Sequence, residues 1–249
     1  MPESLSVLER EPASAPPAID PAHTALFLDL DGTLAGIEAH PDHVVASPER
    51  TRVIREAARR LDGRLAVVSG RSLGDLDRIL ERAVPAAAAV HGLVRRNAAG
   101  AVMTRAPHPG VNTARVMLDR LADRPGIMIE DKMLGLAIHY RGAPEREAEV
   151  IDIARRTAAT TGLVLQLGSM VAELRTPGAD KGASVRAFMS EAPFAGATPV
   201  FVGDDLTDED GFAAAAELGG HGVLVGPGRE SAAHYRLEDV EAVLAWLSA

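Results

Sequence analysis

The chain has 249 residues, of which 47% are hydrophobic and 24% charged, a composition typical of a globular protein with a substantial core. Its 35 acidic residues outnumber the 26 basic ones, and the formal net charge of −9 argues against general binding to nucleic acid or anionic membranes. The chain contains no cysteine, which excludes disulfides, thiol catalysis and thiolate zinc sites.

The N-terminal segment carries no targeting signal that we recognise. Residues 1–21 are rich in Glu, Pro, Ala and Ser, lack the apolar core of a signal peptide, and are predicted to form a mobile tail. Elsewhere no apolar run approaches the roughly 18 residues that a membrane helix needs. We therefore expect a cytoplasmic protein with no membrane partner.

The segment from Ala25 to Leu34 begins with an unbroken apolar run, which leads into two aspartates and a Gly-Thr turn. Such a run predicts a parallel strand that is buried on both faces. Asp29 and Asp31 are two residues apart, so both side chains leave the strand end in the same direction. Neighbouring carboxylates repel each other unless a cation such as Mg²⁺ holds them. The Asp-x-Asp pattern alone also fits an acidic turn that has no catalytic or metal-binding role.

The next elements alternate between helix and strand. The loop from residue 37 to 46 holds His40 and His43, whose spacing suggests a metal site, although a solvated loop is the preferred interpretation because no third ligand lies nearby. A helix capped by Ser47 follows, and then a strand over residues 65–68 that ends at Ser69-Gly70-Arg71. A hydroxyl, a backbone N–H and a guanidinium in succession can all donate hydrogen bonds to a phosphoryl group.

The pattern changes in the middle of the chain. Residues 86–103 predict a hairpin at the edge of a first domain, with a His91-Gly92 turn inside it. From about residue 107 come a helix, two strands, a helix and two strands, the pattern of a small α+β unit. We therefore predict an inserted cap domain over residues 107–178 and a catalytic core built from residues 22–106 and 179–249.

The α/β pattern resumes at Asp180-Lys181-Gly182. A lysine at a helix start is unfavourable for the helix dipole, which indicates a role other than surface solvation for Lys181. A buried strand over residues 199–202 then ends in three aspartates, Asp204, Asp205 and Asp208, and a final helix is predicted from Leu237 to Leu247.

Taken together, these motifs resemble the haloacid-dehalogenase-like (HAD) phosphohydrolases over residues 24–249. The resemblance rests on Asp29-Leu30-Asp31-Gly32-Thr33, the strand-ending Ser69, the lone Lys181 and the acidic residues after the strand that ends near Gly203. Within the predicted cap, three segments resemble the trehalose-6-phosphate phosphatases, as does the His91-Gly92 turn: Glu130-Asp131-Lys132, His139-Tyr140-Arg141 and Gly168-x-x-Val171-x-Glu173-Leu174.

The resemblance implies an α/β fold, with a HAD-like Rossmannoid core, a parallel sheet and an inserted α+β cap. It also implies Mg²⁺-dependent hydrolysis of trehalose 6-phosphate, in which Asp29 forms an aspartyl-phosphate and Asp31 acts as general acid and base. The implied Mg²⁺ ligands are Asp29, the Asp31 carbonyl and Asp204, with Asp205 and Asp208 as supports. The implied phosphate contacts are Ser69, Gly70, Arg71 and Lys181. The implied sugar contacts are His91, Gly92, Glu130, Lys132, Arg141 and Glu173.

Two positions depart from the family pattern on the substrate side. Ser169 stands where a lysine is usual, and Val94 stands where a glutamate is usual. The alternatives are therefore another capped HAD phosphatase, acting on sucrose phosphate or a glycosyl-phosphoglycerate, a phosphomutase, or a non-enzymatic sugar-phosphate sensor. The expected partner is a small sugar phosphate and not nucleic acid. The sequence leaves the oligomeric state open, although it favours a monomer.

Overall fold

The computed structural model describes residues 14–38, 40–132, 134–168, 170–178 and 180–249. The described chain divides into two compact units, one within Met1–Thr104 and Ala179–Ala249, the other formed by Arg105–Gly178. The predicted cap, residues 107–178, begins two residues later than the second unit. That this unit acts as a cap remains a prediction.

The first unit is built on an eight-stranded sheet in the order β12-β11-β10-β1-β2-β3-β4-β5. The strands from β12 to β3 are parallel to one another, whereas β4 and β5 form the antiparallel hairpin expected at the edge. The expected α/β fold with a mostly parallel sheet is thus confirmed. The strand bounds are Thr24–Leu28 (β1), Leu65–Val68 (β2), Ala86–Ala89 (β3), Val94–Arg96 (β4), Val102–Thr104 (β5), Thr198–Gly203 (β10), His221–Val225 (β11) and Tyr235–Leu237 (β12).

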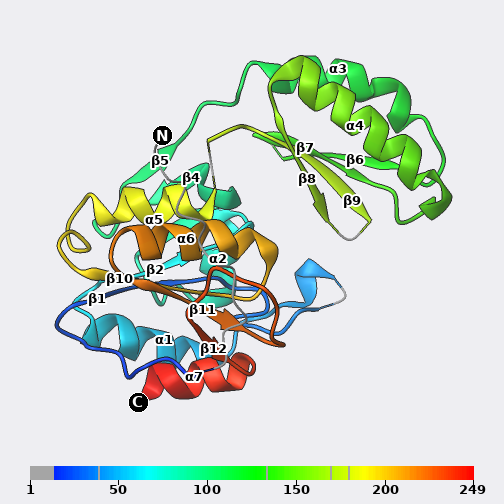
Figure 1. Cartoon of the computed structure of the whole chain (residues 1–249). Helices are drawn as coiled ribbons and strands as arrows, with labels where there is room; N and C mark the ends of the chain where they lie inside the picture. The colour runs from blue at the N-terminus through cyan, green and yellow to red at the C-terminus, as the bar shows by residue number, and fades with distance from the viewer. Residues whose placement is uncertain (1–13, 39, 133, 169, 179) are drawn as a thin grey trace, which may run out of the picture. The chain divides into compact units, whose positions relative to one another are not determined.

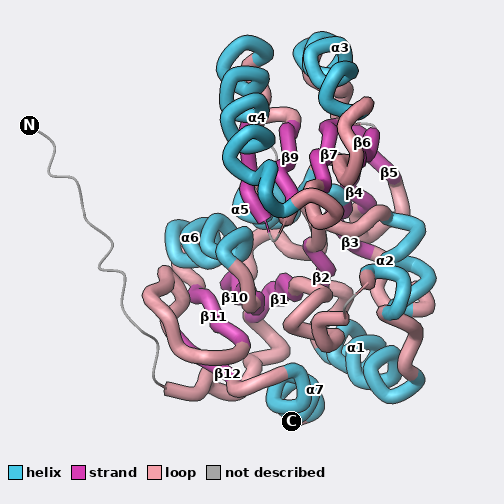
Figure 2. Tube along the Cα trace, turned by 90° about the vertical axis from the view of Figure 1, so that its right-hand side faces the viewer, coloured by secondary structure: helices cyan, strands magenta, loops and turns pink. Residues whose placement is uncertain are grey.

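Helices cover both faces of this sheet, as Figure 2 shows, with α5 and α6 on one side of the central strands and α1 and α7 on the other. Side-chain alternation along β1 produces the two layers, because Leu26 and Leu28 pack into one apolar cluster and Phe27 into the other. The Phe27 ring stacks on Phe194 at 5.5 Å between centroids. The helix bounds are Pro48–Arg60 (α1), Leu73–Leu80 (α2), Lys181–Met189 (α5), Glu209–Glu217 (α6) and Val240–Ser248 (α7).

The last helix begins later than predicted. Residues Tyr235–Leu237 form β12, which pairs with β11, and α7 begins only at Val240. Asp239 sets this start, because its carboxylate accepts a hydrogen bond from Ala242 N at 2.8 Å and so caps the first turn.

The second unit is a four-stranded antiparallel sheet in the order β6-β7-β9-β8, with α3 and α4 against it (Figure 1). Its own core contains Leu118 and Val150 from the helices and Leu136, Ile138 and Leu174 from the strands. The bounds are Gly110–Ala122 (α3), Met128–Asp131 (β6), Gly135–His139 (β7), Glu147–Thr161 (α4), Val164–Gly168 (β8) and Val171–Arg175 (β9).

The described part of the predicted N-terminal tail is held by the first unit. The carbonyl of Ser14 accepts a hydrogen bond from Arg236 N at 2.9 Å, and the carbonyl of Pro17 accepts one from the Trp246 indole at 2.9 Å. Residues 14–21 are therefore attached to the core, which the prediction did not anticipate, and residues 1–13 lie outside the described residues. In the described part of the chain, no helix has the length and apolarity needed to span a membrane.

Candidate active site

Asp29 and Asp31 leave the carboxyl end of β1 and take different partners. Asp29 is buried, and its N–H donates to Val202 O at 2.9 Å, which extends the pairing with β10. Its carboxylate lies 3.0 Å from the Lys181 ammonium. The Asp31 carboxylate is about one-third exposed and accepts two hydrogen bonds of 2.7 Å from the Arg71 guanidinium. This bidentate geometry fixes the orientation of Asp31.

The turn after Asp31 brings this strand end against Asp204. Gly32 has a φ of +79°, and a Cβ at this position would lie 2.0 Å from the Asp204 carboxylate. Only glycine permits both the backbone conformation and the close approach. The buried Thr33 hydroxyl is 3.4 Å from the other Asp204 oxygen. The Gly-Thr pair of the first motif thus packs directly on the strand end of β10.

Lys181, the first residue of α5, is almost completely buried between two carboxylates. Its ammonium is 2.6 Å from Asp208 Oδ1 and 3.0 Å from Asp29 Oδ2. Burial lowers the pKa of Lys181, but the attraction of Asp29 and Asp208 outweighs it and holds the pKa above its usual value. These two charges compensate for the unfavourable position of a cation at a helix N-terminus.

Asp208 and Asp205 have different surroundings, although both were expected to support the metal. Asp208 is fully buried, and its Oδ2 accepts hydrogen bonds of 3.0 Å from the backbone N–H groups of Asp204 and Asp205. Its Oδ1 takes the Lys181 ammonium. Asp205 is exposed, and its carboxylate accepts from Leu206 N at 2.6 Å, which caps the short helix η4 (Leu206–Asp208). Asp208 therefore holds the backbone of the loop after β10, and Asp205 caps the short helix with which this loop ends.

The donor set fits a hard divalent cation. Carboxylate oxygens of Asp29, Asp204 and Asp208 lie within 4.8 Å of one another. Among the described residues, this group includes neither the Asp31 nor the Asp205 side chain. Because both Asp208 oxygens already accept hydrogen bonds, Asp29 and Asp204 are the carboxylates available as ligands.

The electrostatics of the group also favour a cation. Burial raises the pKa of Asp29 to about 8, although Lys181 acts against this shift. Burial and the nearby Asp208 raise the pKa of Asp204 to about 6. These raised pKa values mean that the neighbouring carboxylates are costly to ionise together, and a bound Mg²⁺ would favour their ionised forms.

The predicted phosphate-binding segment lies at the carboxyl end of β2. Ser69 is buried, and its hydroxyl oxygen accepts from Arg71 N at 3.3 Å. The Arg71 guanidinium, predicted to contact phosphate, directs two of its five N–H groups to Asp31. The segment therefore joins the predicted general acid to the strand end of β2.

His91 and Gly92 belong to the first unit and connect this segment to α5. They lie in the short helix η2 (Val90–Gly92), whose three residues have left-handed φ values between +48° and +92°. A Cβ on Gly70 would lie 2.6 Å from the His91 ring, and one on Gly92 would lie 2.3 Å from the Ser184 hydroxyl of α5. Close packing thus explains both glycines. The predicted sugar contacts of His91 and Gly92 remain predictions.

Three of the predicted sugar contacts meet on the sheet of the second unit. Lys132 Nζ lies 2.7 Å from Glu173 Oε1 and 3.9 Å from Glu130 Oε2. The same Glu130 oxygen lies 2.9 Å from His139 Nε2, so His139 joins the group, although of its segment only Arg141 was named among the implied sugar contacts. In β7, His139 lies two residues from Ala137, which is the register partner of both Glu130 and Glu173. Strand alternation therefore places the His139 side chain on the same face of the sheet as theirs.

The remaining substrate-side positions do not join this group. Arg141 is exposed in the turn after β7, and Val94 lies in β4 of the first unit, paired with Thr104. Ser169 lies outside the described residues, so the structure assigns nothing to it.

A mostly parallel sheet with Asp29, Asp204 and Lys181 at its carboxyl edge, and an antiparallel α+β unit inserted in the chain, are the features expected from the resemblance to the HAD phosphohydrolases. A solved HAD subclass IIB sugar phosphatase shares this fold with a TM-score of 0.61 at 14% identity, covering 88% of this chain and 94% of that chain. A family model described as trehalose-phosphatase matches residues 27–241.

Two further comparisons agree with this family model. The chain is 41% identical over 240 residues to the trehalose-6-phosphate phosphatase of Escherichia coli (strain K12), covering 95% of this chain and 90% of the relative. A crystal structure of a trehalose-6-phosphate phosphatase related protein has a TM-score of 0.69 at 26% identity and covers 89% of this chain and 94% of that chain. The chain belongs to the trehalose-phosphatase family and is a phosphoric monoester hydrolase.

Proposed function

We propose that the protein hydrolyses trehalose 6-phosphate to trehalose and inorganic phosphate, with Mg²⁺ as cofactor and an aspartyl-phosphate intermediate. The observation that carries the proposal is the buried Asp29 carboxylate, in contact with Lys181 and within 4.8 Å of the Asp204 and Asp208 oxygens. Supporting it, the Escherichia coli relative is a trehalose-6-phosphate phosphatase by name.

In the first step, an Asp29 oxygen attacks phosphorus while the bond from phosphorus to the sugar oxygen breaks. Asp31 gives its proton to the departing sugar oxygen, which leaves as a neutral hydroxyl. Lys181 holds the attacking carboxylate and offers its ammonium to the phosphoryl oxygens, where charge develops.

In the second step, water attacks phosphorus and the bond to Asp29 breaks, which restores the carboxylate and releases phosphate. Asp31 accepts the proton of that water, and the two hydrogen bonds from Arg71 hold the Asp31 carboxylate in its orientation. Bound Mg²⁺, held by Asp29 and Asp204, would reduce the repulsion between the anionic nucleophile and the anionic phosphate.

Recognition of the sugar is assigned to Glu130, Lys132, Arg141 and Glu173 in the second unit. Carboxylates accept hydrogen bonds from sugar hydroxyls, while ammonium and guanidinium groups donate to them. The clustering of three of these side chains, with Lys132 beside both glutamates, supports a single polar surface for the sugar.

The experiment that tests substrate and cofactor is phosphate release from a panel of esters, with and without Mg²⁺, after chelation with EDTA. The panel contains trehalose 6-phosphate, sucrose phosphate, a glycosyl-phosphoglycerate and p-nitrophenyl phosphate. We expect the highest kcat/KM for trehalose 6-phosphate and no turnover until Mg²⁺ is restored. Preference for another sugar phosphate would overturn the substrate, and full activity after exhaustive chelation would overturn the metal.

A second experiment tests the covalent step. Asp29→Asn should abolish phosphate release, because an amide oxygen does not attack phosphorus. Rapid quenching of the unaltered protein with ³²P-labelled substrate should give labelled protein that hydroxylamine strips, and Asp29→Asn should give none. Label on Asp29→Asn, or turnover by it at the unaltered rate, would contradict the mechanism.

A further inference from the structure

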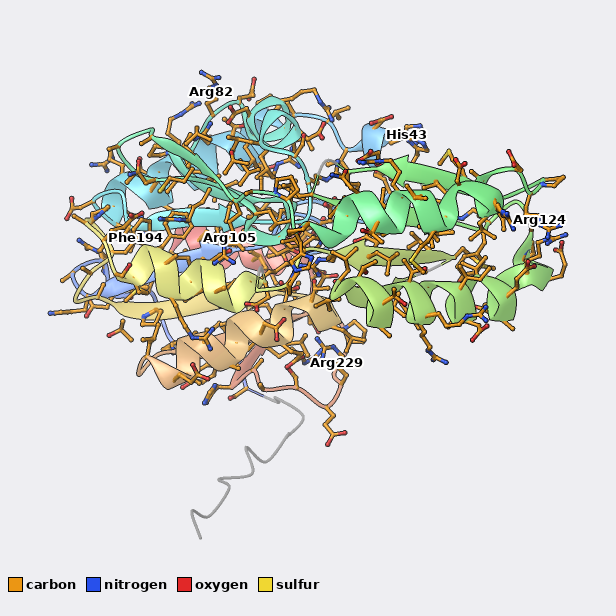
Figure 3. All side chains as sticks on the ribbon, turned by 90° about the horizontal axis from the view of Figure 1, so that it is seen from above. His43, Arg82, Arg105, Arg124, Phe194 and Arg229 are labelled. Atoms are coloured by element: carbon orange, nitrogen blue, oxygen red, sulfur yellow. The ribbon has the colours of Figure 1, made fainter. Side chains whose placement is uncertain are left out.

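The loop that follows β11 is fastened to the loop that carries Asp204. Arg229, labelled in Figure 3, lies in the first of these loops, 24 residues from Asp205 in the sequence. One end of its guanidinium donates to the carbonyl oxygen of Asp205 at 3.0 Å. The other end forms an ion pair with Glu209, the first residue of α6.

Glu209 also holds the loop of Arg229 in place. One of its oxygens accepts from the Ser231 hydroxyl at 2.8 Å, and the other accepts from Ala232 N at 2.8 Å. Both charged side chains are only about one-quarter exposed. The set of Arg229, Glu209 and Ser231, here called the clasp, therefore joins two loops at the carboxyl edge of the sheet through charge-assisted hydrogen bonds.

The clasp acts on the same short segment as Asp208, but on other atoms. Asp208 accepts from the N–H groups of Asp204 and Asp205, whereas Arg229 donates to the carbonyl of Asp205. The residue that follows Asp204 is thus held at both its N–H and its carbonyl. Without Arg229, the carbonyl side retains the hydrogen bond from Asp208 N, at 3.1 Å.

We propose that Arg229, supported by Glu209, is a positioning residue that fixes Asp204 for Mg²⁺. The inference rests on the proposed function, because it requires Asp204 to be a metal ligand. Hydrogen-bonding partners that orient a metal ligand change metal affinity about 10- to 100-fold when they are removed. Since Arg229 acts through the backbone and not on the Asp204 carboxylate, we expect a loss of about tenfold, the low end of that range.

The test is Mg²⁺ binding measured by calorimetry on the whole protein, alongside the thermal unfolding midpoint in EDTA and in Mg²⁺. Arg229→Ala should raise the Mg²⁺ dissociation constant about tenfold and reduce the gain in midpoint that Mg²⁺ produces, because that gain depends on affinity. Its KM for trehalose 6-phosphate at saturating Mg²⁺ should stay unchanged.

The matched control is Arg186→Ala. Arg186 joins α5 to α6 through a hydrogen bond of 2.6 Å to Glu217, so the variant removes an arginine–glutamate pair remote from the Asp204 loop. It should bind Mg²⁺ like the unaltered protein. If Arg229→Ala fails to fold, Arg229→Lys and Glu209→Gln carry the test, each with an affinity between those of the unaltered protein and the expected alanine variant.

The outcomes separate the two proposals. If the unaltered protein bound no Mg²⁺, the metal part of the proposed function would fail. If the unaltered protein bound Mg²⁺ and the foldable Arg229 and Glu209 variants bound it equally well, the clasp would be structural only and the inference would be wrong. The inference would also be wrong if Arg186→Ala weakened binding as much as Arg229→Ala.

Discussion

Three carboxylates follow β10 within five residues, and their surroundings give them different tasks. Asp204 turns its oxygens toward Asp29 and Gly32, Asp205 caps a short helix, and Asp208 is buried beneath the loop. Their side chains are chemically identical, so only the distribution of partners distinguishes a ligand from a support.

This difference predicts unequal costs of truncation. Asp208→Ala leaves the buried Lys181 ammonium with one carboxylate and two backbone N–H groups without their acceptor, a loss of about 3–5 kcal/mol by analogy with broken buried ion pairs. Asp205→Ala removes a cap, which costs about 1 kcal/mol. Urea unfolding in EDTA measures both, and similar losses would contradict the assignment.

A second prediction concerns Arg50, a guanidinium that is only 6% exposed. It donates to the carbonyls of Val45 at 2.6 Å and Ile79 at 3.0 Å, and burial lowers its pKa. Arg50→Met leaves both carbonyls without this donor and should cost about 1–3 kcal/mol. Arg52→Met, at an exposed position of the same helix, is the control and should change the free energy of unfolding by less than about 0.5 kcal/mol. Equal effects would mean that helix composition, not the buried hydrogen bonds, sets the cost.

At the scale of elements, the parallel strands deliver side chains from distant parts of the chain to one edge of the sheet. The chain order of β1, β2 and β10 differs from their spatial order, yet their carboxyl ends are adjacent. Asp29, Ser69 and Asp204 therefore converge without any local sequence relation.

The edge pair β11 and β12 gives a prediction about pH. His221 begins β11, stacks edge-on against Tyr235 at 4.9 Å, and its Nε2 is buried with no hydrogen-bond partner among the described residues. Burial, with a smaller contribution from His234, lowers the pKa of His221 below its usual 6.5. The unfolded chain therefore binds a proton more readily than the folded one.

It follows that His221 destabilises the fold as pH drops below about 6.5, since protonation then favours the unfolded state. His221→Phe should flatten the fall in unfolding midpoint between pH 7 and pH 5. His43→Gln, at an exposed position, serves as the control for the loss of a histidine. If His221→Phe left the pH profile unchanged, the titration of His221 would not contribute to acid sensitivity.

At the scale of the whole molecule, each unit has its own core, and two chain segments connect them. Within the second unit, the two ends are joined, because Arg105 donates to Gly178 O at 2.6 Å and His108 N donates to Thr176 Oγ1 at 3.2 Å. The second unit is therefore compact, with a core of its own and hydrogen bonds between residues near its two ends.

The substrate prediction at this scale concerns Ser169, where the resemblance led us to expect a lysine. A charged hydrogen bond contributes about 1.5–3 kcal/mol, so Ser169→Lys should raise kcat/KM for trehalose 6-phosphate roughly 10- to 100-fold. The rate with p-nitrophenyl phosphate should stay the same, because this ester offers no sugar hydroxyls. Equal changes with both substrates would indicate a structural effect. Turnover of another sugar phosphate but not of trehalose 6-phosphate would mark a different specificity.

The sequence by itself determined the parts of this protein that depend on neighbouring residues. The apolar run before Asp29, the turn at Gly32 and the strand ending in Ser69 are local patterns, and the order of these patterns identified the family. The inserted unit was also visible, because its elements interrupt the α/β alternation. Each single motif or element is decided within about ten residues, where period and turn chemistry apply, and their order along the chain can be followed directly in the sequence.

Only the tertiary structure decided which roles are taken by residues of the same type. Asp205 and Asp208 are equivalent candidates in the sequence, but the fold buries one beside Lys181 and exposes the other. The pairing of Arg71 with Asp31 and of Arg229 with Asp205 joins residues 40 and 24 positions apart. Such partners depend on the packing of whole strands and helices, because a hydrogen bond forms only at a separation of about 3 Å, which no local pattern encodes.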